Sequence, residues 1–402
     1  MESDEEPCTV PRDGEQPGVW SCQVGSGPFS LLLGAPLVPE CPPPVYLSMR
    51  ELSNAWPTDF RAMLAGFSLP PEGGMVLVDP RVIENQRGVI VDVVKAVAAC
   101  MVKGKGVVGL SLPIRLFEPR STIERMLDRW AFAPVFLPGA ELCGNVERFK
   151  RVLAMAIAGL HIRPSQEKPF NPLLGDTLQA QWPDGMKAYC EHTSHHPPVS
   201  NFFVQGASFT ITGHYELAGR FKGNSLLGSI VGPTTVTFAS GQKVTYTYGD
   251  YRVGGMLYGT RSANWEGEMH FEDKDSEISA TVKFGPEQKK SLFRSRIGKN
   301  DDFAGSLSLA GEEVSAIEGN WLKNLIIDGV EYWNVDTHKG VFHTFSAHPL
   351  PSDWRYREDL VWLWRGNRQL AETWKHRIEE RQRQDRHLRS KSLHARPNLP
   401  RP

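Results

Sequence analysis

Adjacent histidines followed by two prolines carry the most specific chemistry in this sequence. Residues 191–198 read Glu-His-Thr-Ser-His-His-Pro-Pro. Each imidazole can donate or accept a hydrogen bond near neutral pH, and the first proline keeps His196 out of the helical region. We therefore expect a stiff, extended segment that holds His195 and His196 in place. Such a segment suits a phosphate group, which requires several donors at fixed spacing.

Two other interpretations of these histidines stay open at this point. His192 and His196 stand four residues apart, a spacing that on a helix would point both rings at one metal ion. Thr193, Ser194 and the two prolines disfavour a helix there, so we expect no metal. The histidines could equally be structural groups at a sheet edge, and the residues alone do not separate this interpretation from an anion site.

Two motifs that would indicate an enzyme lack either a required residue or the required structural context. A hydrolase with His195 or His196 as its base needs a nucleophile, yet the stretches at Ser208 and Ser225 both lack the second glycine of Gly-x-Ser-x-Gly. Residues 104–109 form a literal G-x-G-x-x-G, but a dinucleotide site needs a helix that opens there, and the residues up to 113 are predicted to be strand or coil. We expect neither enzymatic activity nor a cofactor, and a hydrolase stays the alternative.

Two helices are predicted upstream of the histidines. Ser121 is expected to cap a helix and to form a capping box with Glu124, and the helix would bury an apolar face between Ile123 and Trp130. Residues 146–160 predict a second helix that ends near Gly159. Its last part is small and apolar all round, as expected of a helix buried inside a barrel.

A long meander of strands is predicted around and beyond the histidines. Residues 235–238, 243–248 and 277–284 alternate or are β-branched, with Gly, Asn or Asp turns between them, and the pattern continues from 317 to 345. A sheet of so many strands must curl or close. A closed barrel of that size can enclose an apolar ligand.

Length, charge and cysteine content limit the classes of protein to which this chain can belong. The chain has 402 residues, a formal net charge of −1 and six cysteines without a Cys-x-x-Cys pair, which argues against nucleic-acid binding and fits a reducing compartment. The acidic start lacks an apolar core, so we expect no signal peptide. The longest apolar stretch, 89–102, is broken by Asp92 and Lys95 and falls short of the roughly 18 residues that span a bilayer.

The C-terminal part turns helical and basic after Pro351. Lys375, Glu379 and Arg383 fall at i, i+4 and i+8, along one helix face. Taken alone, such a run is typical of a solvated helix. We assign residues 1–84 to a partly disordered extension, 85–390 to a single domain and 391–402 to a disordered tail.

A second motif upstream of the histidines points to a known family. Residues 168–176 read Lys-Pro-Phe-Asn-Pro-Leu-Leu-Gly-Asp. The two segments resemble KPFNPxLGE and EQ[VT]SHHPP, the paired motifs of the oxysterol-binding-protein-related family of lipid transfer proteins. Asp176 stands in place of Glu and His192 in place of Gln. The similarity runs from about Val89 to Arg386 and suggests a short form without a pleckstrin-homology domain.

The resemblance implies a mostly β fold with α-helices. The expected architecture is a large, incomplete antiparallel β-barrel around a lipid tunnel, with a central helix, an N-terminal lid at about 89–109 and C-terminal helices. The lid hinges would be Gly104, Gly106 and Gly109. The C-terminal pattern K-x-x-x-E-x-x-x-R of the family, which folds over the tunnel mouth, also matches this chain. The headgroup-binding residues implied by the resemblance are Lys168, Asn171, His195, His196, Lys375, Glu379 and Arg383.

The implied function is exchange of lipids without covalent chemistry. A monomeric, cytoplasmic protein would visit anionic membrane surfaces at contact sites, carry phosphatidylinositol 4-phosphate one way and return with a second lipid. Sterol is the default ligand of the family, whereas residues 112–121, LPIRLFEPRS, resemble LPTFILEPRS of its phosphatidylserine-carrying branch. Arg115 places a charge where a tunnel wall would be apolar, unless it reaches a headgroup or solvent. A static lipid sensor would share every binding residue and is a further alternative.

Overall fold

The computed structural model describes residues 46–48, 60–89, 91–93, 95, 111–162, 164–285, 287–288, 296–297 and 300–395. They fall within one compact unit, Val45–Pro402. Of the expected N-terminal extension, 1–84, residues 1–45 and 49–59 lie outside the described residues. The same holds for most of the expected lid at 89–109, including Gly104, Gly106 and Gly109.

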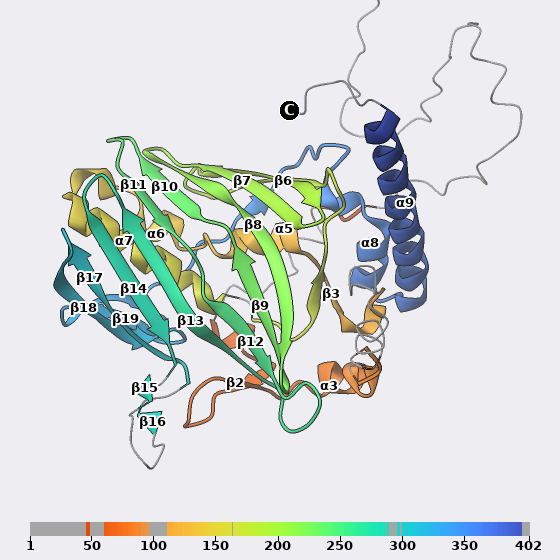
Figure 1. The fold of residues 1–402 in the computed structure, drawn as a ribbon, viewed down its shortest axis with the longest axis horizontal. Coiled ribbons are helices and arrows are strands. Elements are labelled where there is room, and N and C mark those ends of the chain that lie inside the picture. Colours follow the sequence, from red (N-terminus) through yellow and green to blue (C-terminus); the bar gives the residue numbers. More distant parts are fainter. Residues whose placement is uncertain are drawn as a thin grey trace, which may run out of the picture. The chain divides into compact units, whose positions relative to one another are not determined.

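A single large sheet dominates the described part of the chain (Figure 1), in which 17 strands are joined by antiparallel pairing. Its strands are β1 (Phe67–Ser68), β2 (Met75–Leu77), β5 (Thr177–Gln181), β6 (Lys187–His195), β7 (Pro198–Gln205), β8 (Phe209–Lys222), β9 (Ser225–Val231), β10 (Thr234–Phe238), β11 (Lys243–Tyr246), β12 (Asp250–Gly254), β13 (Ser262–Asp273), β14 (Ile278–Phe284), β17 (Asp302–Leu309), β18 (Glu312–Asn320), β19 (Asn324–Ile327), β20 (Val330–Asn334) and β21 (Thr344–Phe345). The predicted strands at 235–238, 243–248 and 277–284 are confirmed as β10, β11 and β14.

The sheet follows the chain order of a meander, with one fork. β5, β6, β7 and β8 pair in sequence, and β8 is long enough to pair with β10 along its first half and β9 along its second. The two branches rejoin at β13, and the sheet continues through β14 and β17 to β20. β21 pairs with β5 at the opposite end. β20 pairs with β19, and no described residue pair joins β20 to β21, so the predicted antiparallel barrel is incomplete.

Alternating burial gives the sheet an inner and an outer face. Along β14, buried and exposed residues alternate without interruption, so one face packs inward and the other meets solvent. Trp321 and Trp333 are both completely buried. The inner face thereby gathers the aromatic and aliphatic side chains that form one continuous core.

The predicted central helix is α7 (Asn145–Ala158), which lies inside the curve of the sheet. Phe149 packs on Phe271 of β13 with ring centroids 6.4 Å apart, while Glu147 accepts a 2.7 Å hydrogen bond from Tyr332 of β20. Residues 152–158 are at most 1 % exposed, which confirms the all-round burial expected from their small apolar side chains. A β-carbon at the following Gly159 would lie 2.4 Å from the carbonyl oxygen of Arg129, so the chain requires glycine at this crossing.

The helix after Ser121 forms as predicted, but its capping box does not. Ser121 occupies the N-cap position of α5 (Thr122–Asp128), yet its side chain makes no capping hydrogen bond. Glu124 instead pairs with Arg120 at 2.8 Å, and Asp128 is a second partner at the same distance. Because the Arg120 side chain is completely buried, its guanidinium requires carboxylate partners. Glu124 therefore pairs with Arg120 and does not form the capping box.

The terminal elements complete the same unit. α2 (Phe60–Met63) and α3 (Pro80–Gln86) flank β1 and β2, and β2 pairs with β13, so the expected border at residue 84 divides elements that the structure places together. The parallel strands β3 (Phe117–Ser121) and β4 (Lys168–Phe170) form a separate pair. The remaining short elements are α6 (Ala133–Phe136), β15 (Glu287–Gln288), β16 (Arg296–Ile297) and the 3-10 turns η2 (Ile114–Leu116), η3 (Ala140–Leu142), η4 (Gly159–His161) and η5 (Trp354–Tyr356).

Two C-terminal helices, expected from the sequence, close the described chain. α8 (Glu358–Trp364) packs on β3, and α9 (Arg368–Ala395) packs on α8. α9 is helical through Ala395, so the expected tail from 391 begins as helix. None of the described helices is long and apolar enough to cross a bilayer.

Candidate anion-binding site

The histidine motif forms the end of a hairpin. β6 remains extended up to His195, which pairs with Pro198 at the start of β7. The chain therefore turns at His196-Pro197, whereas the sequence predicted an extended segment throughout. The rings of His195 and His196 lie with centroids 4.9 Å apart, which confirms that the segment holds both imidazoles side by side.

The upstream motif folds against the same strand. Gly175 N–H donates to the carbonyl oxygen of His192, and His192 N–H donates to that of Asp176, both at 2.9 Å. The carboxylate of Asp176 accepts a 2.7 Å hydrogen bond from the Leu173 N–H and closes the loop. Burial raises the pKa of Asp176 to about 6. The shorter side chain of Asp176 thus has a structural role, because it stabilises the loop that ends at this residue.

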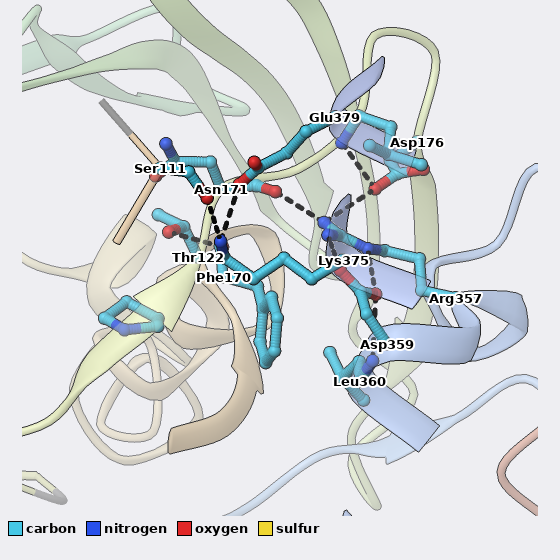
Figure 2. A network of polar contacts seen from close by, with 12 residues as sticks. Ser111, Thr122, Phe170, Asn171, Asp176, Arg357, Asp359, Leu360, Lys375 and Glu379 are labelled. Atoms are coloured by element: carbon cyan, nitrogen blue, oxygen red, sulfur yellow. Dashed lines mark hydrogen bonds and ion pairs between the residues drawn. The ribbon is translucent and has the colours of Figure 1, made fainter. Parts of the chain in front are cut away.

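Two lysines that are far apart in the sequence converge on one aromatic ring. Lys168 Nζ donates to Asn171 Oδ1 at 2.8 Å and lies 5.0 Å from the ring centre of Phe117. Lys375 Nζ lies 5.5 Å from the same centre, donates to Ser111 Oγ at 2.7 Å and pairs with Glu379 at 2.8 Å (Figure 2). The structure therefore brings together Lys168, Asn171, Lys375 and Glu379, as the resemblance implied.

Positive charge accumulates around Lys168. Burial, followed by the nearby cations Arg357 and Lys375, lowers the pKa of Lys168 to about 8, although Glu379 and Glu118 act in the opposite sense. Cations that repel one another at a partly buried site favour an anion that would neutralise them. A phosphate group placed there would gain charge-assisted hydrogen bonds from more than one donor.

Burial and nearby cations also act on the two motif histidines. Burial lowers the pKa of His195 below its ordinary range, and His196, Arg357 and Arg386 lower it further. The pKa of His196 is also lowered by burial and by Arg386. Both rings are consequently neutral at pH 7 and can each take up a proton when an anion arrives.

Arg357 is a central residue of the site that the sequence did not reveal. Its buried guanidinium donates to the backbone carbonyl of Asn171 and pairs with Asp359 at 2.8 Å and Asp176 at 3.7 Å (Figure 2). It thus ties α8 to the loop that follows Lys168. No periodicity or motif marks Arg357 within the basic C-terminal stretch, so only the tertiary structure identifies it.

Arg383 is a predicted site residue that the described contacts do not connect to this cluster. Its side chain is exposed and pairs with Glu380 at 2.9 Å. Arg386, one turn further along α9, lowers the pKa of both His195 and His196. A role for Arg383 in anion binding stays a prediction.

His192 supports the motif from inside the sheet. Its Nδ1 lies 2.9 Å from Ser200 Oγ, and its Nε2 lies 3.3 Å from Nδ1 of His195. Burial, with smaller effects of His195 and Arg357, lowers the pKa of His192 to about 4, so the ring is neutral and orients its neighbour. Within the described part of the chain, no cluster of three or more His, Cys, Asp or Glu side chains is arranged to hold a metal ion.

A cavity of about 280 Å³ adjoins the cation cluster and shares Asp176 and Arg357 with it. Its other lining residues come from the loop after Asn171, from the segment around η5 and from the outer part of α9. They are Leu173, Leu174, Pro351, Ser352, Asp353, Tyr356, Glu358, Ile378, Arg381, Gln382, Asp385 and Arg389. The space beside the cluster is therefore lined by apolar side chains as well as by charges of both signs.

An incomplete antiparallel barrel with an inner helix and C-terminal helices defines a lipid-binding domain. The sequence model described as oxysterol-binding protein matches residues 97–399, and the chain belongs to this family. Oxysterol-binding protein 9 of Dictyostelium discoideum is 34% identical over 336 residues, which cover 78% of this chain and 78% of that protein. Oxysterol-binding protein-related protein 5 of Homo sapiens is 28% identical over 307 residues, which cover 70% of this chain and only 34% of that relative.

Solved structures show the same fold. The Osh3 ORD from Saccharomyces cerevisiae, in complex with PI(4)P, superposes with a TM-score of 0.59 at 22% identity and covers 73% of this chain and 84% of its own. The Osh1 ORD domain in complex with cholesterol gives 0.58 at 21% identity and covers 70% and 76%. The family binds and transfers lipids and does not consist of enzymes, so the hydrolase alternative is set aside.

Proposed function

We propose that this chain binds phosphatidylinositol 4-phosphate and exchanges it for a second lipid between membranes. The 4-phosphate would be held by Lys168, Lys375, His195 and His196, with Asn171 and Glu379 positioning the two lysines. The observation that carries the proposal is the convergence of both ammonium groups on Phe117. A phosphomonoester carries about −1.5 to −2 charges and three acceptor oxygens, which suits a site with an excess of donors.

The lipid body would be buried in a tunnel within the apolar interior of the incomplete barrel. The inner face of the sheet supplies aliphatic and aromatic side chains for this purpose. Burial of the acyl chains or sterol rings would contribute roughly 25 cal/mol for each Å² removed from water. The charged headgroup would then stay at the rim, where cations and hydrogen-bond donors compensate for its lost hydration.

Phosphatidylinositol 4-phosphate is the ligand in the Osh3 complex, and cholesterol and ergosterol are the ligands in two Osh1 complexes. For this chain the second lipid is proposed to be a sterol or phosphatidylserine. Arg115 is exposed on η2, so its charge meets solvent and does not count against an apolar tunnel. We further propose a cytoplasmic monomer that associates peripherally with anionic membranes at contact sites.

Extraction from liposomes tests the headgroup site. The double variant His195→Ala/His196→Ala should fail to extract phosphatidylinositol 4-phosphate, because it loses two donors that the loop holds in place. His270→Ala, which removes an exposed histidine on β13, is the matched control and should extract normally. Undiminished extraction by the double variant would contradict the proposal. A two-membrane transfer assay then separates a carrier from a static sensor, since only a carrier delivers lipid to acceptor vesicles.

A further inference from the structure

Two chain turns meet at one end of the sheet, away from the histidine hairpin. β9 pairs with β12, and Ser225 lies opposite Gly254, so the turn before β9 adjoins the loop after β12. In Figure 1 this loop extends beyond the ends of β9 and β12, beside β2. The side chains of Phe221 and Lys222 at the end of β8, and of Leu257 and Tyr258 in the loop after β12, are exposed and are here called the tip.

The backbone under the tip is held in one shape. Asn224 Oδ1 accepts hydrogen bonds from the N–H groups of Leu257 at 2.7 Å and Tyr258 at 3.3 Å, and Asn224 Nδ2 donates to the Tyr258 carbonyl at 2.7 Å. Gly255 has a φ of +67°, and a β-carbon there would lie 2.1 Å from the Thr260 carbonyl oxygen. These contacts mean that little conformational entropy remains to be lost when the tip binds a surface.

The tip combines apolar side chains with positive charge. Tyr258 is 73% exposed, Phe221 42% and Leu257 41%. Residues 219–231 and 250–262, which include the tip, contain four Lys or Arg residues and one acidic residue, Asp250, which pairs with Arg220 at 2.8 Å. Tyrosine and phenylalanine favour the boundary between water and hydrocarbon, and cations are attracted to anionic lipid headgroups.

The small size of the tip argues for a bilayer over a protein partner. Its three apolar side chains expose together roughly 300 Å², estimated from the area of such side chains. A stable protein interface buries about 800 Å² on each partner. A bilayer needs no such area, because a few inserted side chains and several cations together give useful membrane affinity.

The tip is also tied to the elements that lead into the headgroup site. Arg261, at the end of the β12–β13 loop, donates to Gln86 at the end of α3 and to Gln166, at 2.8 and 3.0 Å. Gln166 precedes Lys168 by two residues. A surface that holds the tip would therefore also orient α3 and the start of β4.

We propose that the tip inserts into the headgroup layer of anionic membranes and docks the protein there. Membrane docking depends on the proposed function only in that a lipid carrier must meet a bilayer. It does not depend on which headgroup fills the cation cluster.

Vesicle sedimentation tests the docking surface. Vesicles of one part phosphatidylserine to four parts phosphatidylcholine are mixed with the wild-type chain, the double variant Leu257→Ser/Tyr258→Ser, and the control Leu142→Ser. Leu142 is 88% exposed on η3 and lies outside the tip. The partition coefficient of the double variant should fall about tenfold through lost apolar burial, while the control partitions like the wild type. Lys222→Ala should weaken binding at low salt and lose its effect at high salt.

Equal partitioning of the wild type and the double variant would overturn the proposal, as would an equal loss in Leu142→Ser. Binding of soluble dioctanoyl phosphatidylinositol 4-phosphate, measured without vesicles, should be the same for all variants. If the wild type does not bind this soluble lipid, the headgroup site is refuted, whereas the vesicle comparison still decides the role of the tip.

Discussion

Replacement of Lys375 by methionine should weaken binding of phosphatidylinositol 4-phosphate strongly. The side chain of Lys375 is 4% exposed, and its Nζ lies within 2.8 Å of Glu379 and 2.7 Å of Ser111. Methionine retains the apolar stem and removes the charge. Loss of one charge-assisted hydrogen bond costs about 1.5–3 kcal/mol, which corresponds to a roughly 10- to 150-fold higher Kd.

The partner of Lys375 must be considered in the same experiment. Burial disfavours the carboxylate of Glu379, but hydrogen bonds from Lys375 and Ser111 lower its pKa overall. Lys375→Met leaves this carboxylate half-buried and unpaired with its lysine, so the single variant should be less stable than Lys375→Met/Glu379→Gln. The double variant removes the added repulsion between Glu379 and the phosphate. The loss of affinity that persists in it measures the contribution of the Lys375 cation itself.

Arg381→Met is the matched control, because it also removes one positive charge from α9 but at an exposed position. An exposed charge contributes about 0–1 kcal/mol, so its Kd should rise less than about fivefold. Titration with soluble dioctanoyl phosphatidylinositol 4-phosphate measures all three variants without a membrane. Equal losses for Lys375→Met and Arg381→Met would show a diffuse basic surface and would refute a defined lysine site.

Three further predictions follow from the histidines and the end of α9. Binding of the soluble lipid should strengthen as the pH falls from about 7.5 to about 6, because the lowered pKa values of His195 and His196 rise when a phosphate is bound; calorimetry should find a steeper pH dependence than in the His195→Ala/His196→Ala variant. The free energy of unfolding should fall as the pH drops from about 6.5 to about 4, because His192 takes up a proton in the unfolded chain but stays neutral in the folded one. In urea unfolding, the His192→Gln variant should lose less stability over this pH range. Arg386→Ala should weaken lipid binding more than Arg383→Ala, because Arg386 acts on both motif histidines, and the reverse order would restore Arg383 to the site.

Local patterns determined the classes of element and where most of them lie. Two-residue alternation predicted β14, and a run of small apolar residues predicted the buried end of α7. These assignments succeed because a strand or a buried helix must match its side-chain pattern to its own burial. The capping box at Ser121 failed for a different reason. The pattern there is compatible with a cap, but a buried arginine competes for the same glutamate.

The paired motifs likewise identified most residues of the candidate site, but not how they meet. Lys168, Asn171 and the two histidines lie in short segments that carry their own turn chemistry. Their proximity to Lys375 could not be derived from spacing, since α9 reaches Phe117 through the packing of α8 on β3 and of α9 itself on η2. The resemblance supplied that association in advance, and the structure supplies the contact.

What the sequence determined by itself is therefore the chemistry of each segment: neutral imidazoles before two prolines, a lysine-containing loop and a basic helix. Tertiary structure alone decided that Arg357 holds the loop through the Asn171 carbonyl, and that Arg386 acts on both motif histidines. It also decided that the two turns of the tip lie together. The physical reason is that electrostatic and hydrogen-bonding partners are set by distance in space, and residues that are far apart in the chain become neighbours only when the sheet closes around its core.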